Sequence, residues 1–93
     1  MKALSHEEIQ RKLAALEGWT FTPQGIRKRY EMGNFLSAMN LVKRVADLAE
    51  SANHHPDIFI SYDKVIFTLT THDAGGITEK DFELAGKIEA IAP

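Results

Sequence analysis

The spacing of apolar residues along the chain follows two periods, and together they predict seven elements of secondary structure. Apolar residues recur at helical spacing after Ser5, after Asn34 and after Thr78. The first helix is expected to end near Gly18, the second to be bounded by Pro56, and the third to run to about Ala92. Short segments typical of half-buried strands lie between them, at residues 19–22, 26–32, 58–62 and 65–71.

Two of the predicted helices begin with the same chemical pattern. Ser5 can cap the first helix while Glu8 stands at its third position, and Thr78 and Asp81 repeat this arrangement at the last helix. The central helix should bury one apolar face. That face is expected to contain Phe35, Met39, Val42, Ala46 and Ala49, widened by Leu36, Val45 and Leu48.

The order helix, strand, strand, helix, strand, strand, helix predicts an α+β fold. Paired strands separated by helices favour an antiparallel sheet with the helices on one face. We therefore expect a four-stranded antiparallel sheet covered by three helices, in a single domain spanning residues 1–93. On the last strand, Val65, Phe67 and Leu69 share one apolar face that should meet the core, while the opposite face becomes polar toward His72.

Composition narrows the functional classes. Of the 93 residues, 44% are hydrophobic and 26% are charged, as in soluble globular proteins. No apolar run approaches a membrane span, and the N-terminus lacks the apolar core of a signal peptide, so a cytoplasmic protein without membrane contacts is expected. The absence of cysteine excludes thiol chemistry. A net charge of −2 argues against nucleic-acid binding, and the basic run 27–29 is interpreted as the solvent side of a strand.

Three of the four histidines lie within 19 residues, and they are the main candidates for chemistry. His54 and His55 are adjacent and precede Pro56, whereas His72 follows the last predicted strand. If strands 58–62 and 65–71 form an antiparallel hairpin, the end of the second strand returns beside the start of the first. This topology predicts that His72 lies near His54 and His55, at the end of the sheet where the central helix terminates.

The cluster permits more than one chemistry. Three histidines can hold zinc, but adjacent side chains diverge, and spacings of two on a strand or four on a helix are the usual ligand arrangement. Proton transfer fits better, because histidine titrates near physiological pH and an acid–base pair needs groups on both sides of a substrate. Asp73 and Asp81 could orient an imidazole. Structural explanations also remain open. His6 lies at a helix N-terminus, where it is interpreted as a surface or structural residue, and the Asp81 carboxylate is favoured at a helix start.

The chain resembles the pterin-4a-carbinolamine dehydratases over nearly its whole length. The resemblance rests on an acidic residue followed after three positions by His-His-Pro, an aromatic residue after five more, a histidine after a further nine, and an aspartate beyond. Here these residues are Glu50, His54, His55, Pro56, Tyr62, His72 and Asp81. The segment from Thr71 to Asp81, before the last helix, also matches. The family's four-stranded sheet with three helices agrees with the predicted order.

The resemblance implies a substrate and a reaction. The substrate would be 4a-hydroxytetrahydropterin, which an aromatic amino acid hydroxylase leaves after using tetrahydrobiopterin. The products would be quinonoid dihydropterin and water, with no metal or organic cofactor. Family members are homodimers or homotetramers, so an oligomer is implied.

The resemblance also implies roles for individual residues. His54 and His72 would form the acid–base pair, and His55 would line the pocket and polarise the substrate. Glu50 and Asp81 would orient the histidines. The pterin would be bound, partly through backbone groups, by two segments: Asn53, His54 and His55, and Thr70, Thr71, His72 and Asp73.

Two departures and two alternatives remain. Ile58 stands where many relatives carry an aromatic residue, which could weaken stacking on the pterin, and Ala74 replaces a cysteine found in some relatives. The same fold could instead serve as a non-enzymatic binding or oligomerisation module with structural histidines. A histidine-based metal enzyme is the third hypothesis, and metal analysis of the purified protein would test it.

Overall fold

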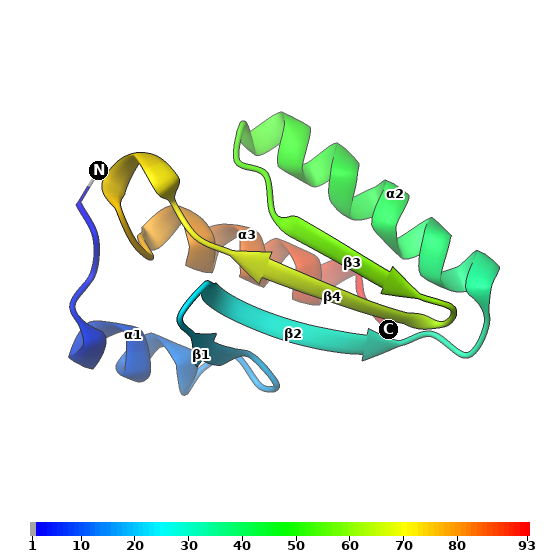
Figure 1. The fold of residues 1–93 in the computed structure, drawn as a ribbon, viewed down its shortest axis with the longest axis horizontal. Helices are drawn as coiled ribbons and strands as arrows, with labels where there is room; N and C mark the ends of the chain where they lie inside the picture. Colours follow the sequence, from blue (N-terminus) through cyan, green and yellow to red (C-terminus); the bar gives the residue numbers. More distant parts are fainter. Residues whose placement is uncertain (1) are drawn as a thin grey trace.

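The computed structural model describes residues 2–93, and its elements follow the predicted order (Figure 1). The helices and strands are α1 (His6–Leu13), β1 (Thr20–Thr22), β2 (Gly25–Glu31), α2 (Phe35–Ala52), β3 (Asp57–Ser61), β4 (Lys64–Leu69), the short 3-10 helix η1 (His72–Ala74) and α3 (Glu79–Ile91). The prediction of three helices and a four-stranded antiparallel sheet is confirmed.

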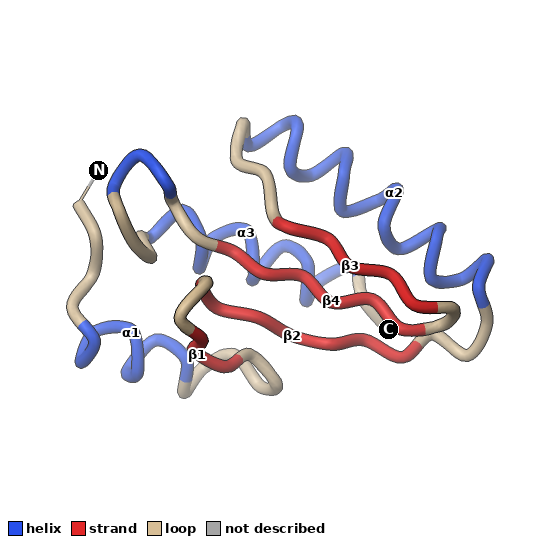
Figure 2. Tube along the Cα trace, viewed as in Figure 1, coloured by secondary structure: helices blue, strands red, loops and turns tan. Residues whose placement is uncertain are grey.

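The sheet has the strand order β1-β2-β4-β3, so β1 and β3 form its edges. Ile26, Val65, Phe67 and Leu69 point from its two central strands into the core and are completely buried. They pack with side chains of α2 and α3, which lie together along one face of the sheet (Figures 1 and 2). Alternation along β4 therefore places its apolar side inward, as the sequence predicts.

Both predicted capping boxes are present. Ser5 and Glu8 exchange two hydrogen bonds at the start of α1, and Thr78 and Asp81 satisfy the first turn of α3. The two boxes differ in burial: Glu8 is exposed, whereas Asp81 is completely buried. Only the carboxylate of the second box, that of Asp81, therefore lies where other parts of the molecule can hydrogen-bond to it.

The predicted apolar face of α2 is wrong in part. The buried positions are Ala38, Leu41, Val45 and Ala49. Phe35, Leu36 and Met39, which were expected in the core, are 51%, 70% and 39% exposed. The helix is apolar around much of its circumference, so hydrophobicity alone does not identify the inward side. Alanine at two buried positions lets α2 lie close to α3 and β4, which it contacts.

The last strand is shorter than predicted. It ends at Leu69, and Thr71 forms only an isolated bridge with Gly76. The backbone N–H of Thr71 donates to the Gly76 carbonyl at 3.0 Å, and the N–H of Gly76 donates back at 3.3 Å. These bonds close a loop on itself instead of extending the sheet. His72 consequently lies in η1 and not at a strand end.

The basic run on β2 does not lie wholly on the solvent side. Strand alternation turns Lys28 inward, where its Nζ donates to both carboxylate oxygens of Glu89 at 3.0 and 2.9 Å. The Tyr30 hydroxyl also donates to Glu89. Strand β2 and helix α3 are therefore joined by a charged contact across 61 residues of sequence. Across residues 2–93, no helix combines the length and apolar character needed to cross a bilayer.

Candidate active site

The end of α2 positions the adjacent histidines. Asn53 follows the helix in a left-handed conformation, with φ 50° and ψ 43°, which asparagine tolerates better than most residues. This turn lets the N–H of His54 donate to the Ala49 carbonyl at 3.1 Å, so the last helical carbonyls are satisfied. Pro56 then precedes β3. The chain therefore reverses direction at the two histidines.

The β3–β4 hairpin returns the chain to the same end of the sheet. Asp57 pairs with Thr68, so residues 70–73 emerge beside the residues that precede β3. In Figures 1 and 2, the C-terminal end of α2 and the loop that contains η1 lie at the same end of the sheet. The structure thus brings the predicted segments together.

An open hollow of about 270 Å³ lies between these segments. It is lined by Asn53, His54, His55, Thr70, Thr71, His72, Asp73 and Lys80. All three candidate catalytic histidines and every predicted substrate-binding residue are in this set. Lys80 is the addition that the sequence reasoning missed. A lysine in a helical first turn carries no spacing signal of its own, although its position beside Asp81 could have drawn notice.

His54 is held by a buried carboxylate. Its Nε2 lies 2.5 Å from Oδ1 of Asp81, and its side chain is 10% exposed. The other oxygen of Asp81, Oδ2, accepts from the Thr71 hydroxyl and from the Thr78 backbone N–H, each at 2.9 Å. Asp81 comes from α3 and His54 from the end of α2. The carboxylate therefore joins two elements directly behind the hollow.

The hydrogen-bond network assigns the donors. Thr71 has one hydroxyl proton, which it gives to Asp81, so the contact of 2.8 Å between the two threonine hydroxyls is donated by Thr78. A carboxylate only accepts, so His54 donates its Nε2–H to Asp81. A neutral His54 then carries its lone pair on Nδ1. That nitrogen is the one left for a proton transfer.

The other two histidines are held less firmly. Nε2 of His55 lies 2.5 Å from Oε2 of Glu50, but the two side chains are 57% and 78% exposed. An exposed pair of this kind contributes little to holding a geometry. His72 is exposed and makes no side-chain hydrogen bond within residues 2–93. Its ring nitrogens are therefore available to a ligand in the hollow.

Two positions that the resemblance singled out, Tyr62 of the motif and Ile58 among the departures, lie outside this hollow. Tyr62 is in the turn between β3 and β4, at the far end of this hairpin from η1 (Figure 1), and is 65% exposed. Ile58 lies on β3 opposite Phe67 and does not line the hollow. An aromatic residue at position 58 would therefore not line this hollow, so isoleucine at that position removes no stacking surface from it. Among the described side chains, no three His, Asp or Glu residues form a group able to hold a metal ion.

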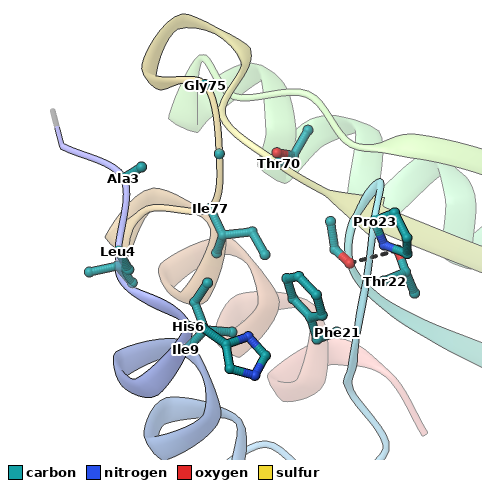
Figure 3. Close-up of a pocket in the computed structure, with 12 residues that line it drawn as sticks. Ala3, Leu4, His6, Ile9, Phe21, Thr22, Pro23, Thr70, Gly75 and Ile77 are labelled. Carbon is teal, nitrogen blue, oxygen red and sulfur yellow. Dashed lines mark hydrogen bonds between the residues drawn. The ribbon is translucent and has the colours of Figure 1, made fainter.

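A second hollow, which shares only Thr70 with the first, is drawn in Figure 3. It has a volume of about 340 Å³ and is formed by the N-terminal segment, the β1–β2 turn and residues 75–77. His6 is the one titratable side chain among the described residues lining it, and its ring packs edge-on against Phe21. This hollow therefore lacks an acid–base pair, and His6 has a structural explanation.

The structure is that of a small α+β protein with a histidine-lined hollow at one end of its sheet. The family described as "Pterin 4 alpha carbinolamine dehydratase" matches residues 2–91. The chain belongs to this family, as the resemblance indicated.

Individual relatives agree over their full lengths. A protein of Koribacter versatilis (strain Ellin345) is 46% identical over 92 residues, covering 99% of this chain and 98% of its own. A protein of Roseiflexus sp. (strain RS-1) is 52% identical over 88 residues, with 95% of each chain covered. Both are named "Putative pterin-4-alpha-carbinolamine dehydratase". The crystal structure of "transcriptional coactivator/pterin dehydratase" from Brucella melitensis superposes with a TM-score of 0.94 at 34% identity, covering 99% of this chain and 100% of that chain.

Proposed function

We propose that this chain dehydrates 4a-hydroxytetrahydropterin to quinonoid dihydropterin and water by histidine acid–base catalysis. The observation that carries the proposal is the hollow lined by His54, His55 and His72, in which His54 is held by the buried carboxylate of Asp81. Membership of the dehydratase family supports the same chemistry.

The reaction makes modest demands on the protein. The carbon that carries the hydroxyl group is bonded to a ring nitrogen whose lone pair can expel hydroxide. The C–O bond breaks, a C=N bond forms, and the nitrogen loses its proton. A base must accept that proton while an acid converts the leaving hydroxyl into water. Positioning and two proton transfers suffice, and each transfer typically contributes ~10²–10⁴-fold in rate.

The hydrogen bonding suggests which histidine performs which transfer. His54 carries a proton on Nε2, directed at Asp81, and so offers Nδ1 as the base for the ring N–H proton. The imidazolium that results would be stabilised by the adjacent carboxylate. His72 has no protein partner for its ring and would supply the proton to the leaving hydroxyl. His55, oriented by Glu50, would polarise the substrate.

The remaining residues of the hollow would hold the pterin ring. Asn53 and residues 70–73 lie beyond the ends of α2 and β4. The backbone N–H and C=O of Thr71 are already bonded within the loop, so the amide-like edge of a pterin would pair with backbone groups of the residues beside it. We place the reaction in tetrahydrobiopterin recycling, after an aromatic amino acid hydroxylase, because that enzyme class forms the substrate.

A coupled hydroxylase assay tests the function. The parent protein should accelerate loss of 4a-hydroxytetrahydropterin, and His72→Ala should lower that rate by about 10²-fold or more because the acid is removed. His6→Ala is the matched control, since this histidine lies in the other hollow. Unchanged turnover in His72→Ala, with folding intact by circular dichroism, would contradict the mechanism.

We also propose that the chain forms a homodimer or homotetramer. Phe35, Leu36 and Met39 expose apolar surface at the start of α2, and Phe59 does so on the edge strand β3, where it is 60% exposed. Apolar surface of this kind and an open strand edge favour association with another chain.

A non-enzymatic binding module is the second candidate, favoured by the same exposed surface and by the coactivator name of the Brucella protein. A variant with His54, His55 and His72 all changed to Ala separates the two functions. Assembly that persists in that variant, with no dehydratase rate in the parent, would favour the module.

A further inference from the structure

We propose that the site favours pterins whose ring substituent carries an anionic group, either a carboxylate or a phosphate. The inference rests on the proposed function, because it assumes that a pterin ring occupies the hollow at the histidines. It concerns a third hollow, which lies beside the histidine hollow along helix α3.

The two hollows share part of their walls. The adjoining one has a volume of about 240 Å³ and is lined by Ala52, His54, Lys80, Glu83, Leu84 and Lys87. His54 and Lys80 also line the histidine hollow, whose volume is about 270 Å³. Each alone is smaller than the roughly 300–1,000 Å³ of common ligand sites, whereas both together fall within that range. His54 and Lys80 line both hollows, so the two are neighbours, and a substituent on the ring would extend past these two side chains toward Lys87.

Lys80 occupies a position that the helix itself does not favour. It lies in the first turn of α3, where the positive end of the helix dipole attracts acidic side chains and repels cations. The acidic neighbours are already engaged: Glu79 pairs with Lys12 at 2.9 Å, and Asp81 binds His54. Lys80 forms no ion pair within residues 2–93. Its charge at the junction of the two hollows is available to a ligand.

Lys87 continues this charge along the helix. It lies seven residues after Lys80, about two turns or ~10 Å further on, and on a similar side of α3. It too forms no ion pair among the described residues, and it lines the adjoining hollow. Glu83 lies between the two lysines and is the one acidic residue lining this hollow among residues 2–93. In the adjoining hollow two cations therefore face one anion, while Asp73 lies in the histidine hollow, beside the ring and not beside its substituent.

The expected preference is moderate because all three charged side chains are exposed. An exposed ion pair changes affinity by up to about fivefold. Such pairs weaken as ionic strength rises. The positions of these charges determine the direction in which each substitution changes the affinity for an anionic pterin. Removing either lysine should weaken binding, and removing Glu83 should strengthen it.

Calorimetric titration with three stable pterins tests the inference. The probes are neopterin, its 3′-phosphate ester and pteroylglutamate, so that the neutral, phosphate and carboxylate forms are compared on the same folded protein. The variants are Lys80→Gln, Lys87→Gln and Glu83→Gln. The matched control is Lys43→Gln, since Lys43 lies on α2 in neither hollow and pairs with Asp47 at 3.9 Å.

In the parent, at least one anionic probe should bind about three- to tenfold tighter than neopterin at low salt. The ratio should fall in both lysine variants, rise in Glu83→Gln and stay constant in Lys43→Gln. The anionic probe whose ratio falls further in the lysine variants identifies phosphate or carboxylate as the preferred group, because that fall reports the charge and not the size of the substituent. Equal binding of all three probes, or a preference that the lysine variants retain, would overturn the inference while leaving the dehydratase proposal intact. If neopterin does not bind and the coupled assay shows no turnover, both the dehydratase proposal and the proposed preference for anionic pterins are wrong.

Discussion

At the scale of single residues, Asp81 is the side chain on which most of the site depends. Its side chain is completely buried, yet both oxygens have partners: His54 on one, and Thr71 and the Thr78 backbone on the other. A buried carboxylate is tolerated only when it is hydrogen-bonded in this way. The same bonds fix the ring of His54, because Asp81 is itself held by the Thr71 hydroxyl and by the Thr78 backbone N–H.

Asp81→Asn should therefore affect both stability and rate. An amide keeps the size of the side chain but loses the charge and one acceptor, so it cannot receive all three donors. We expect a loss of about 1–3 kcal/mol in the free energy of unfolding and at least a tenfold lower dehydratase rate, since ~10²–10⁴-fold depends on the base. Urea denaturation and the coupled assay measure the two effects.

Asp57→Asn is the control for this change, because Asp57 is an exposed strand carboxylate outside the hollow. A variant at position 81 that matches this control in rate would show that His54 does not need its carboxylate.

The residue scale also shows what sequence reasoning could reach. It identified the three histidines, because hairpin topology and the spacing of the motif both placed them together. The capping pattern alone did not distinguish Asp81 from Glu8, since both complete a capping box; Asp81 was singled out by its nearness to His72 in the sequence and by the family motif, and its burial is visible only in the structure. Sequence reasoning missed Lys80, because only the folded structure brings this lysine next to the histidines, and the sequence around it contains no motif for such a site.

At the scale of elements, strand patterns were more informative than the pattern of the long helix. On β4, one face is uniformly apolar, so alternation leaves a single choice of inward side. On α2, large apolar residues occur on the exposed side and alanines on the buried side. The choice there depends on how closely α2 approaches its neighbours, and residue size along one chain does not contain that information.

The approach of β2 to β4 is set by Gly25. A Cβ at this position would lie 2.1 Å from the carbonyl oxygen of Leu69, and φ is +144°. Leu69 is the last residue of β4, immediately before Thr70 in the hollow. Contact between the strands at Gly25 therefore fixes the point from which the site loop departs.

Gly25→Ala should destabilise the protein by about 3 kcal/mol or more, because backbone strain and a steric clash combine. Gly33→Ala is the matched comparison: φ there is +87°, but nothing lies within 4 Å of the added carbon. It should cost only about 1–2 kcal/mol, for the left-handed conformation alone. Thermal or urea unfolding of both variants checks the difference, and equal losses would contradict the role assigned to the clash.

At the scale of the whole molecule, the contact of Lys28 and Tyr30 with Glu89 joins the sheet to α3. Burial acts to raise the pKa of Glu89, but hydrogen bonds from Tyr30 and Lys28 outweigh it and hold that pKa below its ordinary value. Burial and the bond to Glu89 raise the pKa of the Tyr30 hydroxyl. Because folding lowers the pKa of Glu89, the unfolded state binds protons more readily, and acid should weaken the fold.

The contribution of Glu89 is present above its unfolded pKa of about 4.3 and is lost as pH falls through its lower folded value. Glu89→Gln should lower the free energy of unfolding by about 1–3 kcal/mol at pH 7. The difference between parent and variant should shrink as pH falls below ~4.3. Urea denaturation at a series of pH values measures this, and a difference that stays constant into acid would contradict it.

Association of chains is a property of the whole surface. If Leu36, which is 70% exposed, is covered by another copy, Leu36→Glu would bury a charge and should shift the protein toward smaller assemblies. Light scattering after gel filtration gives the mass. Ser51→Glu introduces the same side chain near the other end of α2 and should leave the mass unchanged. A monomeric parent would contradict the proposal that the chain forms an oligomer. An unchanged mass in Leu36→Glu would show that this end of α2 is not part of the interface.

The position of Asp81 restricts how the chain can vary. Glutamate and glutamine also complete capping boxes, so helix α3 alone would accept either one. Asp81 is completely buried, so an extra methylene would shift the carboxylate from its place against His54, and glutamine would bring no charge to His54. Substitutions at position 81 that helix α3 tolerates would therefore abolish the reaction without unfolding the protein. Among chains that share this fold, the residue at this position should separate those able to turn over a substrate from those that only assemble.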